Sequence, residues 1–346
     1  MAPPARRRAA AAEDIRVAVI GVGNVGATFV QGVDYYSSSG GKNTVGLWHQ
    51  KVAAFDINPS KVGRDLAEVA MSSTKKYHEV KNANNKITVR PGMLLDSFNG
   101  DVKPATTLAA EFAKELQDSG ANVVLNLISS GMDKTSAEYA KAALAAGAAF
   151  VNATPARVAN NPALVSRFAQ KKLVLAGDDL LSQFGGTAFH KGMIDFMVER
   201  GVHVSKSYQL DVGGSEETRR TMDERIKMLK RDMKTSSIGM ESPYRFQSVA
   251  GTTEYTDFLG DSRNSYYWMS CEGFLGSKII MDLTLRTSDG ANAGNVLLDV
   301  ARAARARGSN VKKMTEAINA YGFKKPPRGA KIRQAYADFV RMFVSD

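Results

Sequence analysis

I-R-V-A-V-I-G-V-G-N-V-G, residues 15–26, is the stretch that decides the fold. Its first six residues form a short apolar run rich in β-branched side chains, which is typical of a buried strand. Gly21, Gly23 and Gly26 follow at once, and residues 27–36 have the pattern of a helix. A strand, a glycine turn and a helix in this order predict a dinucleotide-binding unit, because the glycines let the backbone approach a pyrophosphate.

An acidic residue ends the next predicted strand, V-A-A-F-D-I at residues 52–57. Asp56 is placed to accept hydrogen bonds from the adenosine ribose hydroxyls, which favours NAD over NADP. The insertion Ser37–Gln50 explains why Asp56 follows the glycines at a longer distance than is usual. A glycine turn with a purely structural role is the alternative. The cofactor contacts expected in this region are Gly21, Gly23, Asn24, Val25, Gly26, Asp56 and Ile57.

Further apolar strands alternate with helices at residues 123–128, 148–155 and 172–179. Parallel strands joined by crossover helices predict an α/β fold with a doubly wound, Rossmann-type sheet, which binds ligands at the carboxyl ends of its strands. Polar residues fall at those ends, although turn and cap chemistry would also place them there. The residues near these strand ends that we expect to contact the cofactor are Ser129, Thr154, Pro155 and Asp178.

The pattern changes after Gly201. The predicted elements are a strand at residues 203–212, a charged helix from about Glu216 to Met233, strands at residues 265–270 and 278–287, and an amphipathic helix at residues 293–306. Strands without long intervening helices predict an inserted, mixed α+β unit, after which the last helix returns the chain to the first unit. The expected domains are a disordered basic tail (1–13), an NAD-binding Rossmann domain (14–200), an inserted catalytic and oligomerisation domain (201–287) and a C-terminal return to the Rossmann domain (288–346).

The chain of 346 residues carries a net charge of +11 and a single cysteine, Cys271. A lone cysteine excludes a disulfide framework and favours a reducing, cytoplasmic setting. No apolar run suggests a secretory signal or a membrane span, and no DNA- or RNA-reading motif accompanies the charge, so we expect neither a membrane nor a nucleic acid as partner. A small anionic substrate would suit the charge. His190 and Cys271 are interpreted as packing residues.

The run K-M-L-K-R-D-M-K-T, residues 227–235, concentrates positive charge on a predicted helix. Lys230 and Lys234 lie one helical turn apart, so both can project from the same face. A solvated helix face is the alternative for such a run. In a closed site, however, desolvation or a neighbouring ammonium group would lower the pKa of a lysine enough for proton transfer.

The chain from about Val17 to Pro327 resembles the inositol-1-phosphate synthase family in its shorter bacterial and archaeal form. The resemblance rests on separated pieces whose order and spacing agree: G-V-G-N-V-G, A-F-D-I-N-P-S-K-V-G-R-D-L, F-V-N-A-T-P, A-G-D-D-L-L-S-Q-F-G-G-T, Y-Q-L-D-V-G-G, K-R-D-M-K-T, A-N-A-G-N-V-L-L-D-V-A-R-A and A-Y-G-F-K-K-P-P. It implies an NAD-dependent isomerase, a homotetramer, that cyclises a sugar phosphate.

In the reaction that the resemblance implies, NAD⁺ oxidises the sugar at C5, and the ketone acidifies C6. The resulting enolate attacks a carbonyl of the same molecule, and the retained NADH reduces the C5 ketone. Lys230, Lys234 and Lys324 match active-site lysines of the family. Asp178 and Asp179 match an acidic pair near the nicotinamide and its associated ion, whose identity the sequence does not tell. Together with the three lysines, Asp179 is an expected catalytic residue. Asp289 completes the expected cofactor contacts.

The chain departs from the family on the substrate side. Where family members that make inositol phosphate carry a lysine in D-D-R-K, this chain has Asn264, or Ser265 in an ungapped alignment. Ser215, Glu217 and Arg220 stand at expected Asn, Asp and Asn positions, and Leu181 replaces another lysine. The expected substrate contacts are Ser215, Glu217, Arg220 and Asn264.

These departures indicate a different sugar phosphate. Fructose 6-phosphate would close a five-membered carbocycle, as in relatives from pathways to carbocyclic nucleosides, whereas glucose 6-phosphate would give the six-membered ring of myo-inositol phosphate. Both substrates stay open. So do two other classes of protein: an inactive NAD-binding homologue that lost its activity with the lysines, and an ordinary dehydrogenase that releases NADH.

Overall fold

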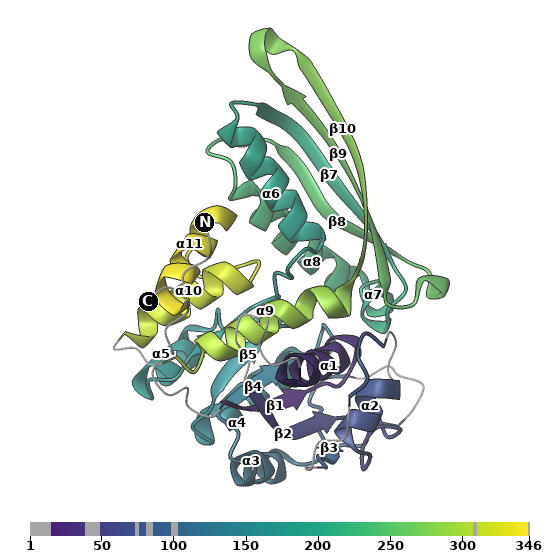
Figure 1. Ribbon diagram of the computed structural model, residues 1–346, viewed down its shortest axis with the longest axis vertical. Helices are drawn as coiled ribbons and strands as arrows, with labels where there is room; N and C mark the ends of the chain where they lie inside the picture. The colour runs from purple at the N-terminus through teal and green to yellow at the C-terminus, as the bar shows by residue number, and fades with distance from the viewer. Residues whose placement is uncertain are drawn as a thin grey trace.

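A computed structural model of the protein describes residues 15–38, 49–72, 76–80, 86–97, 103–306 and 310–344. The predicted basic tail, residues 1–13, lies outside the described residues, as does most of the predicted insertion Ser37–Gln50. Two β-sheets organise the described part, one above the other in Figure 1. Within those ranges every helix is too short or too polar to cross a lipid bilayer.

The first sheet is parallel throughout and has six strands in the order β3-β2-β1-β4-β5-β6. The strands are β1 (Ile15–Ile20), β2 (His49–Asp56), β3 (Val89–Pro91), β4 (Val123–Asn126), β5 (Ala149–Asn152) and β6 (Leu175–Ala176). The strand order reverses between β1 and β4, which is where a doubly wound sheet opens a crevice for a ligand. The predicted Rossmann-type sheet is confirmed.

Helices cover both faces of this sheet, which is why its strands are apolar without alternation. One face carries α1 (Asn24–Ser38), α9 (Asp289–Ala303) and α10 (Val311–Gly322); the other carries α3 (Ala109–Asp118), α4 (Asp133–Ala145) and α5 (Pro162–Gln170); α2 (Leu66–Ser72) packs beside β2 and β3. The helix predicted at residues 293–306 is α9, which starts earlier and packs against α1 (Figure 1).

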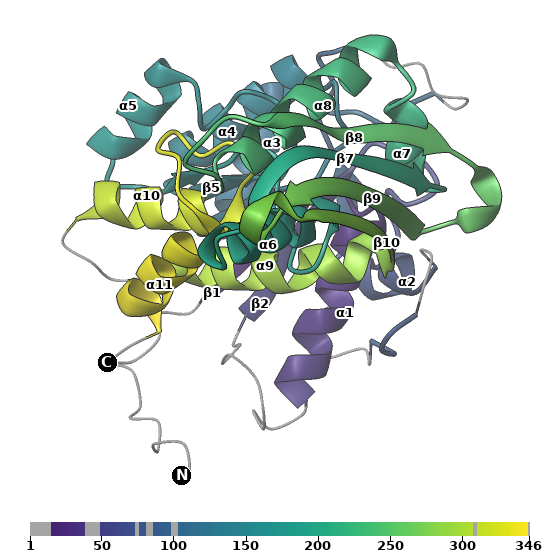
Figure 2. The same cartoon turned by 90° about the horizontal axis from the view of Figure 1, so that it is seen from above.

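The second sheet is mixed, with the order β10-β9-β7-β8 (Figure 2). Its strands are β7 (His203–Gly213), β8 (Gln247–Tyr255), β9 (Ser262–Glu272) and β10 (Lys278–Ser288). β7 and β8 are parallel, whereas β9 is antiparallel to both of its neighbours. Helices α6 (Gly186–Glu199) and α8 (Glu224–Gly239) bury the apolar core of this sheet. The predicted mixed α+β unit is confirmed. Its strand β8 was not among the predicted strands. The predicted domain boundaries stay predictions.

The charged helix expected over Glu216–Met233 is wrong as a single element, because it is two helices: α7 (Glu216–Arg220) and α8. Ser215 caps the first by accepting the N–H of Thr218 at 3.2 Å. Asp223 caps the second by accepting the N–H of Ile226 at 3.1 Å. Two N-caps so close together start two helices in a run that has the charge pattern of one.

A buried ion pair fastens the end of the chain to the second unit. Lys191 on α6 donates to Glu241 at 2.7 Å and to the carbonyl of Ser237 at 3.1 Å, and the two charged side chains are 4% and 0% exposed. The Glu241 carboxylate also accepts the N–H of Ile332, the first residue of α11 (Ile332–Phe343). One carboxylate therefore joins α6, the end of α8 and the start of α11.

Removing one partner of this pair should destabilise the protein strongly. Lys191→Met leaves the Glu241 charge buried without its cation, and we expect a loss of about 3–5 kcal/mol in the free energy of unfolding. Urea denaturation measures the loss. The double variant Lys191→Met/Glu241→Gln buries no charge and should recover much of it; a double variant as unstable as the single one would contradict this interpretation.

Candidate functional site

A cavity of about 830 Å³ lies at the carboxyl ends of the first sheet, where α7, α8 and the strands β7 and β9 approach it. We call it the central cavity. Most of the predicted site residues line it: Lys230, Lys234, Lys324 and Asp179; Gly21, Gly23, Asn24, Val25, Asp56, Ile57, Ser129, Thr154, Pro155 and Asp289; and Ser215, Glu217 and Arg220. Gly26, Asp178 and Asn264 are not in the lining.

The glycine turn shapes one end of the cavity. Gly21 has a φ of +88°, and a Cβ there would lie 2.9 Å from the backbone of Leu127. A Cβ on Gly26 would lie 2.5 Å from the carbonyl oxygen of Gly21, so only a glycine lets α1 pack this closely on the turn. Gly26 itself does not line the cavity. Gly23 faces open space, and α1 starts there at Asn24. The partial positive charge of a helix N-terminus favours a phosphate at this place.

Asp56 lies at the end of β2 beside this turn. Its Oδ2 accepts the N–H of Val22 at 2.9 Å, and its Oδ1 accepts the N–H of Asn58 at 2.8 Å. Lys61 donates to the carbonyl of Val22 at 2.8 Å and lies 3.5 Å from Oδ2. The carboxylate is thereby oriented at the cavity wall, and its remaining lone pairs can accept hydrogen bonds from hydroxyls.

Part of the lining of the cavity is apolar, and we call this part the apolar slot. It comprises Phe55, Met93, Leu94, Pro104, Met132 and Tyr139. The hydroxyl of Tyr139 receives the N–H of Met93 at 2.6 Å and donates to its carbonyl at 3.1 Å, so only the ring faces the slot as an apolar surface. A slot for a flat ring, an acid for a ribose and a glycine turn for a pyrophosphate fit a dinucleotide cofactor.

Asp178 was expected to contact the cofactor, but it is not in the lining of the central cavity. Its buried carboxylate accepts N–H groups of Val158, Ala159 and Asn160 and the side-chain amide of Asn152. These bonds hold the loop that follows β5. Adjacent acidic residues at a strand end point in different directions, and here only the second, Asp179, lines the cavity.

The three predicted lysines meet in the cavity, each on a different carboxylate. Lys230 donates to Glu217, Lys234 to Asp211 at 2.6 Å, and Lys324 to Asp179 at 2.7 Å. Their side chains are 14%, 12% and 14% exposed. The lysine run is therefore not a solvated helix face.

Local structure explains how two of these pairs form. A Cβ on Gly251 of β8 would lie 2.3 Å from the Lys234 side chain, so the missing side chain leaves the path along which Lys234 crosses the strand. Lys324 follows α10, where Phe323 bridges to Leu180 and the N–H of Lys324 donates to the carbonyl of Asp179. That backbone pairing sets the lysine beside the Asp179 carboxylate.

Asp211 on β7 was not among the predicted site residues. It is 1% exposed and accepts hydrogen bonds from Lys234, from Ser265 Oγ at 2.6 Å and from Gln209 Nε2 at 2.8 Å, with Arg263 Nη1 4.0 Å away. Burial alone would raise the pKa of Asp211, but the charges of Lys234 and Arg263 outweigh it and hold the pKa well below its usual value. Alternation along the predicted strand 203–212 was the signal that could have found Asp211.

Burial also changes the proton affinity of Lys234. Loss of water around the ammonium group lowers its pKa, and the charges of Arg263 and Lys324 lower it further, while Asp211 acts in the opposite direction. Arg263 itself donates hydrogen bonds to Asp289: its Nε lies 2.9 Å from both carboxylate oxygens, and its Nη2 lies 2.6 Å from Oδ2. Arg263 was not among the predicted site residues either. It supplies a permanent positive charge beside Lys234.

Asn264 was expected to contact the substrate, but it is not in the lining of the central cavity, and the register of β9 shows why. Arg263, Ser265 and Tyr267 alternate with Asn264 and Tyr266 along the strand, and the first set faces the cavity and the core. Successive side chains of a strand point to opposite faces. Ser265, the residue of the ungapped alignment, therefore takes the inner position, and its neutral hydroxyl binds Asp211.

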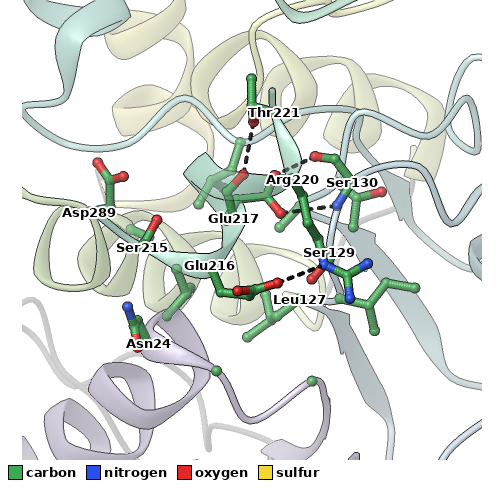
Figure 3. A pocket seen from close by; sticks show the side chains of 18 of the residues that line it. Asn24, Leu127, Ser129, Ser130, Ser215, Glu216, Glu217, Arg220, Thr221 and Asp289 are labelled. Carbon is green, nitrogen blue, oxygen red and sulfur yellow. Dashed lines mark hydrogen bonds and ion pairs between the residues drawn. The ribbon is translucent and has the colours of Figure 1, made fainter. Parts of the chain in front are cut away.

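Glu217 on α7 is bonded to the loop that follows β4 (Figure 3). Its carboxylate accepts the N–H of Ser130 at 3.1 Å and the Ser130 hydroxyl, both from the loop after β4, and also Lys230 from α8. Lys230 donates in addition to Thr221 at 2.9 Å. Arg220 lies 3.5 Å from Glu216 in the same wall.

Asp179 has capacity for a ligand. Its Oδ1 is bound by Lys324, whereas its Oδ2 is buried and has no hydrogen-bond partner among the described residues. A buried carboxylate oxygen without a partner is costly, so a hydroxyl or a cation is the chemistry that would complete it. Within the described ranges, no group of three or more His, Cys, Asp or Glu side chains is arranged to hold a metal ion.

The positive charge of the chain is not concentrated in the cavity. The lining includes seven lysines and arginines, and also seven aspartates and glutamates. An anionic ligand is therefore not drawn in by a surplus of cations, and must be recognised by the positions of individual groups. Lysines oriented by carboxylates, a permanent guanidinium and an open carboxylate oxygen suit proton transfer and the stabilisation of a negative oxygen.

Comparisons with known proteins show the family of the chain. A sequence profile of the family described as myo-inositol-1-phosphate synthase matches residues 185–290. An inositol-3-phosphate synthase of Corynebacterium glutamicum is 30% identical over 316 residues, which cover 84% of this chain and 87% of that protein. An inositol-3-phosphate synthase of Mycolicibacterium smegmatis is 30% identical over 342 residues, 92% of this chain and 94% of that protein.

Solved structures are similar over nearly the whole chain. A crystal structure of Ari2 superposes with a TM-score of 0.72 at 27% identity and covers 96% of this chain and 100% of that one. A myo-inositol-1-phosphate synthase-related protein from Thermotoga maritima has a TM-score of 0.82 at 20% identity, with 95% and 98% covered. The second likeness shows a shared fold.

The lysine pairs should differ in their contribution to stability. Lys234→Met removes the cation nearest to the buried carboxylate of Asp211. Because that charge is then poorly compensated, we expect the free energy of unfolding to fall by about 3 kcal/mol. Lys230→Met frees a Glu217 side chain that is 40% exposed, so water can solvate it and the loss should be at most about 1 kcal/mol. Urea denaturation followed by tryptophan fluorescence measures both. Equal losses would contradict the difference in burial.

Proposed function

Because the chain belongs to the inositol-3-phosphate synthase family, we propose that it is an NAD-dependent isomerase that cyclises a hexose 6-phosphate into a cyclitol phosphate. The observation that carries the proposal is the meeting of Lys230, Lys234 and Lys324 in one cavity beside a dinucleotide-type glycine turn. Bound NAD would supply a reversible hydride transfer at C5 of the sugar. The remaining chemistry falls to side chains of this protein.

The proposed reaction needs proton transfer and a stabilised negative oxygen. A carbonyl at C5 acidifies C6, and loss of the C6 proton gives an enolate that attacks a second carbonyl of the sugar. Lys234 is suited to proton transfer, because burial and neighbouring cations lower its pKa while Asp211 orients its ammonium group. Lys230 and Lys324 stand opposite carboxylates and are suited to hold the developing charge.

The identity of the second carbonyl depends on the substrate side of the cavity. Ser265 is the inward-facing residue where family members that make inositol phosphate are expected to carry a lysine, and a hydroxyl supplies neither a cation nor a titrating amine. This difference favours fructose 6-phosphate, whose C2 carbonyl would close a five-membered ring. The 30%-identical relatives are named inositol-3-phosphate synthases, which favours glucose 6-phosphate and a six-membered ring.

A product assay tests the proposal. The purified protein is incubated with NAD⁺ and either fructose 6-phosphate or glucose 6-phosphate, and NMR identifies the ring size of the product. We expect a five-membered cyclitol phosphate from the ketose and no net accumulation of NADH, because the hydride returns to the substrate.

Other outcomes of this assay distinguish the alternatives. Inositol phosphate formed from glucose 6-phosphate alone would refute the five-membered ring and keep the cyclase. A steady rise of absorbance from NADH would indicate an ordinary dehydrogenase. Binding of NAD⁺ without turnover of either sugar would indicate an inactive homologue.

Two kinds of substitution should separate cofactor binding from chemistry. Asp56→Ala removes the acceptor at the glycine turn and should weaken NAD⁺ binding by about tenfold or more, since a hydrogen bond to a charged group contributes about 1.5–3 kcal/mol. Lys324→Ala should abolish turnover and leave NAD⁺ affinity within about twofold. Calorimetry and the product assay measure the two effects. Normal activity of Lys324→Ala would contradict the assignment.

The assembly and location of the protein stay predictions. Family resemblance predicts a homotetramer, and the single cysteine favours the cytoplasm. Light scattering of the purified protein measures the first.

A further inference from the structure

His190 on α6 is buried completely, yet it is hydrogen-bonded at both ring nitrogens. Its Nε2 lies 2.5 Å from Ser207 Oγ, and its Nδ1 lies 3.3 Å from Gln209 Oε1. Both partners are neighbours on the inner face of β7. A buried imidazole needs partners for both of its nitrogens, so what distinguishes this one is where its partner Gln209 leads.

The bonds of His190 continue to the central cavity. Gln209 Nε2 donates to Asp211 Oδ1 at 2.8 Å, and Asp211 Oδ2 accepts from Lys234 at 2.6 Å. Gln209 and Asp211 are each 1% exposed. The result is one buried chain of hydrogen bonds: Ser207, His190, Gln209, Asp211 and Lys234.

The direction of every bond in this chain follows from its last carboxylate. Asp211 is ionised between two cations and can only accept, so the amide of Gln209 must turn its NH₂ group toward Asp211. The carbonyl oxygen of Gln209 then faces His190, and Nδ1 must carry the hydrogen. Nε2 is left as an acceptor for the hydroxyl of Ser207.

A neutral imidazole satisfies these demands, and the surroundings favour it. Burial lowers the pKa of His190 to about 4, while Gln209 and Asp211 act in the opposite direction. At neutral pH the ring therefore carries a single hydrogen, and the chain determines on which nitrogen.

We propose that His190 is a positioning residue, whose Nδ1–H fixes the amide of Gln209 and, through Asp211, the place of Lys234 in the central cavity. Without this donor, the carbonyl end of the Gln209 amide is no longer fixed, so its NH₂ group no longer lies in one place against Asp211. Asp211 then shifts, and the ammonium group of Lys234 moves with it. The effect on turnover rests on the proposed function of Lys234.

Two substitutions separate this role from packing. In His190→Asn the side-chain amide takes the place of Nδ1 and can still donate to Gln209. In His190→Gln the longer amide takes the place of Nε2, fills more of the volume and faces Ser207 instead. The proposal predicts that Asn replaces His190 better than Gln does, whereas a packing role predicts the reverse.

The expected result is a kcat of His190→Asn within about threefold of the unsubstituted protein. The kcat of His190→Gln should fall by about tenfold or more, by analogy with the loss of groups that orient metal ligands. NAD⁺ affinity should be the same in both variants, because the cofactor end of the cavity is untouched. Equal activity of the two variants, or higher activity of His190→Gln, would overturn the proposal.

A measurement that needs neither variant to be active is the ¹⁵N NMR spectrum of the imidazole. The chain has four histidines, and the signals of His190 are those that His190→Asn removes. We expect the Nδ1–H tautomer, unchanged from about pH 5.5 to about pH 8. The Nε2–H tautomer, or protonation with a pKa near the usual value of about 6.5, would overturn the inference. If the unsubstituted protein turns over no hexose phosphate, the proposed function fails and this spectrum still decides the arrangement of His190.

Discussion

The buried carboxylate of Asp211 is the constraint on which the site depends. A charge without partners in a protein interior costs several kcal/mol, so Asp211 can be buried only where cations and donors surround it. Its partners come from three elements: Gln209 from β7 itself, Ser265 and Arg263 from β9, and Lys234 from α8. Packing of α8 on the sheet and orientation of Lys234 are therefore consequences of the same requirement.

The other two lysines are also held by carboxylates, and the strength of each pair depends on how deeply its carboxylate is buried. Asp179 and Asp211 are nearly buried, so they bind Lys324 and Lys234 strongly. Glu217 is 40% exposed, so it binds Lys230 less strongly. An anionic ligand must compete with these carboxylates, because the cavity has no surplus of cations. Lys230 is the lysine that can exchange its partner at the lowest cost, since water can solvate the carboxylate that it leaves.

The register of β9 decides which of its residues meets Asp211 near the position where the family was expected to carry a lysine. A shift of one position along β9 exchanges the cavity side for the outer side, which is why Ser265 and not Asn264 meets Asp211. Beside Asp211, the neutral hydroxyl of Ser265 and the permanent charge of Arg263 therefore lie close together. This combination is the physical basis of the proposal that the substrate is a sugar phosphate other than that of the inositol phosphate synthases.

The sequence by itself determined the parts that depend on local pattern: the doubly wound sheet, the glycine turn with Asp56, and the lysines one helical turn apart. Tertiary structure alone decided the partner of each lysine, because the residues that meet are far apart in the chain: 145 positions separate Lys324 from Asp179. It also split the charged helix, turned Asn264 outward and linked His190 to Asp211. Each of these outcomes depends on strand register and helix packing, which bring distant side chains together and leave no mark in local periodicity.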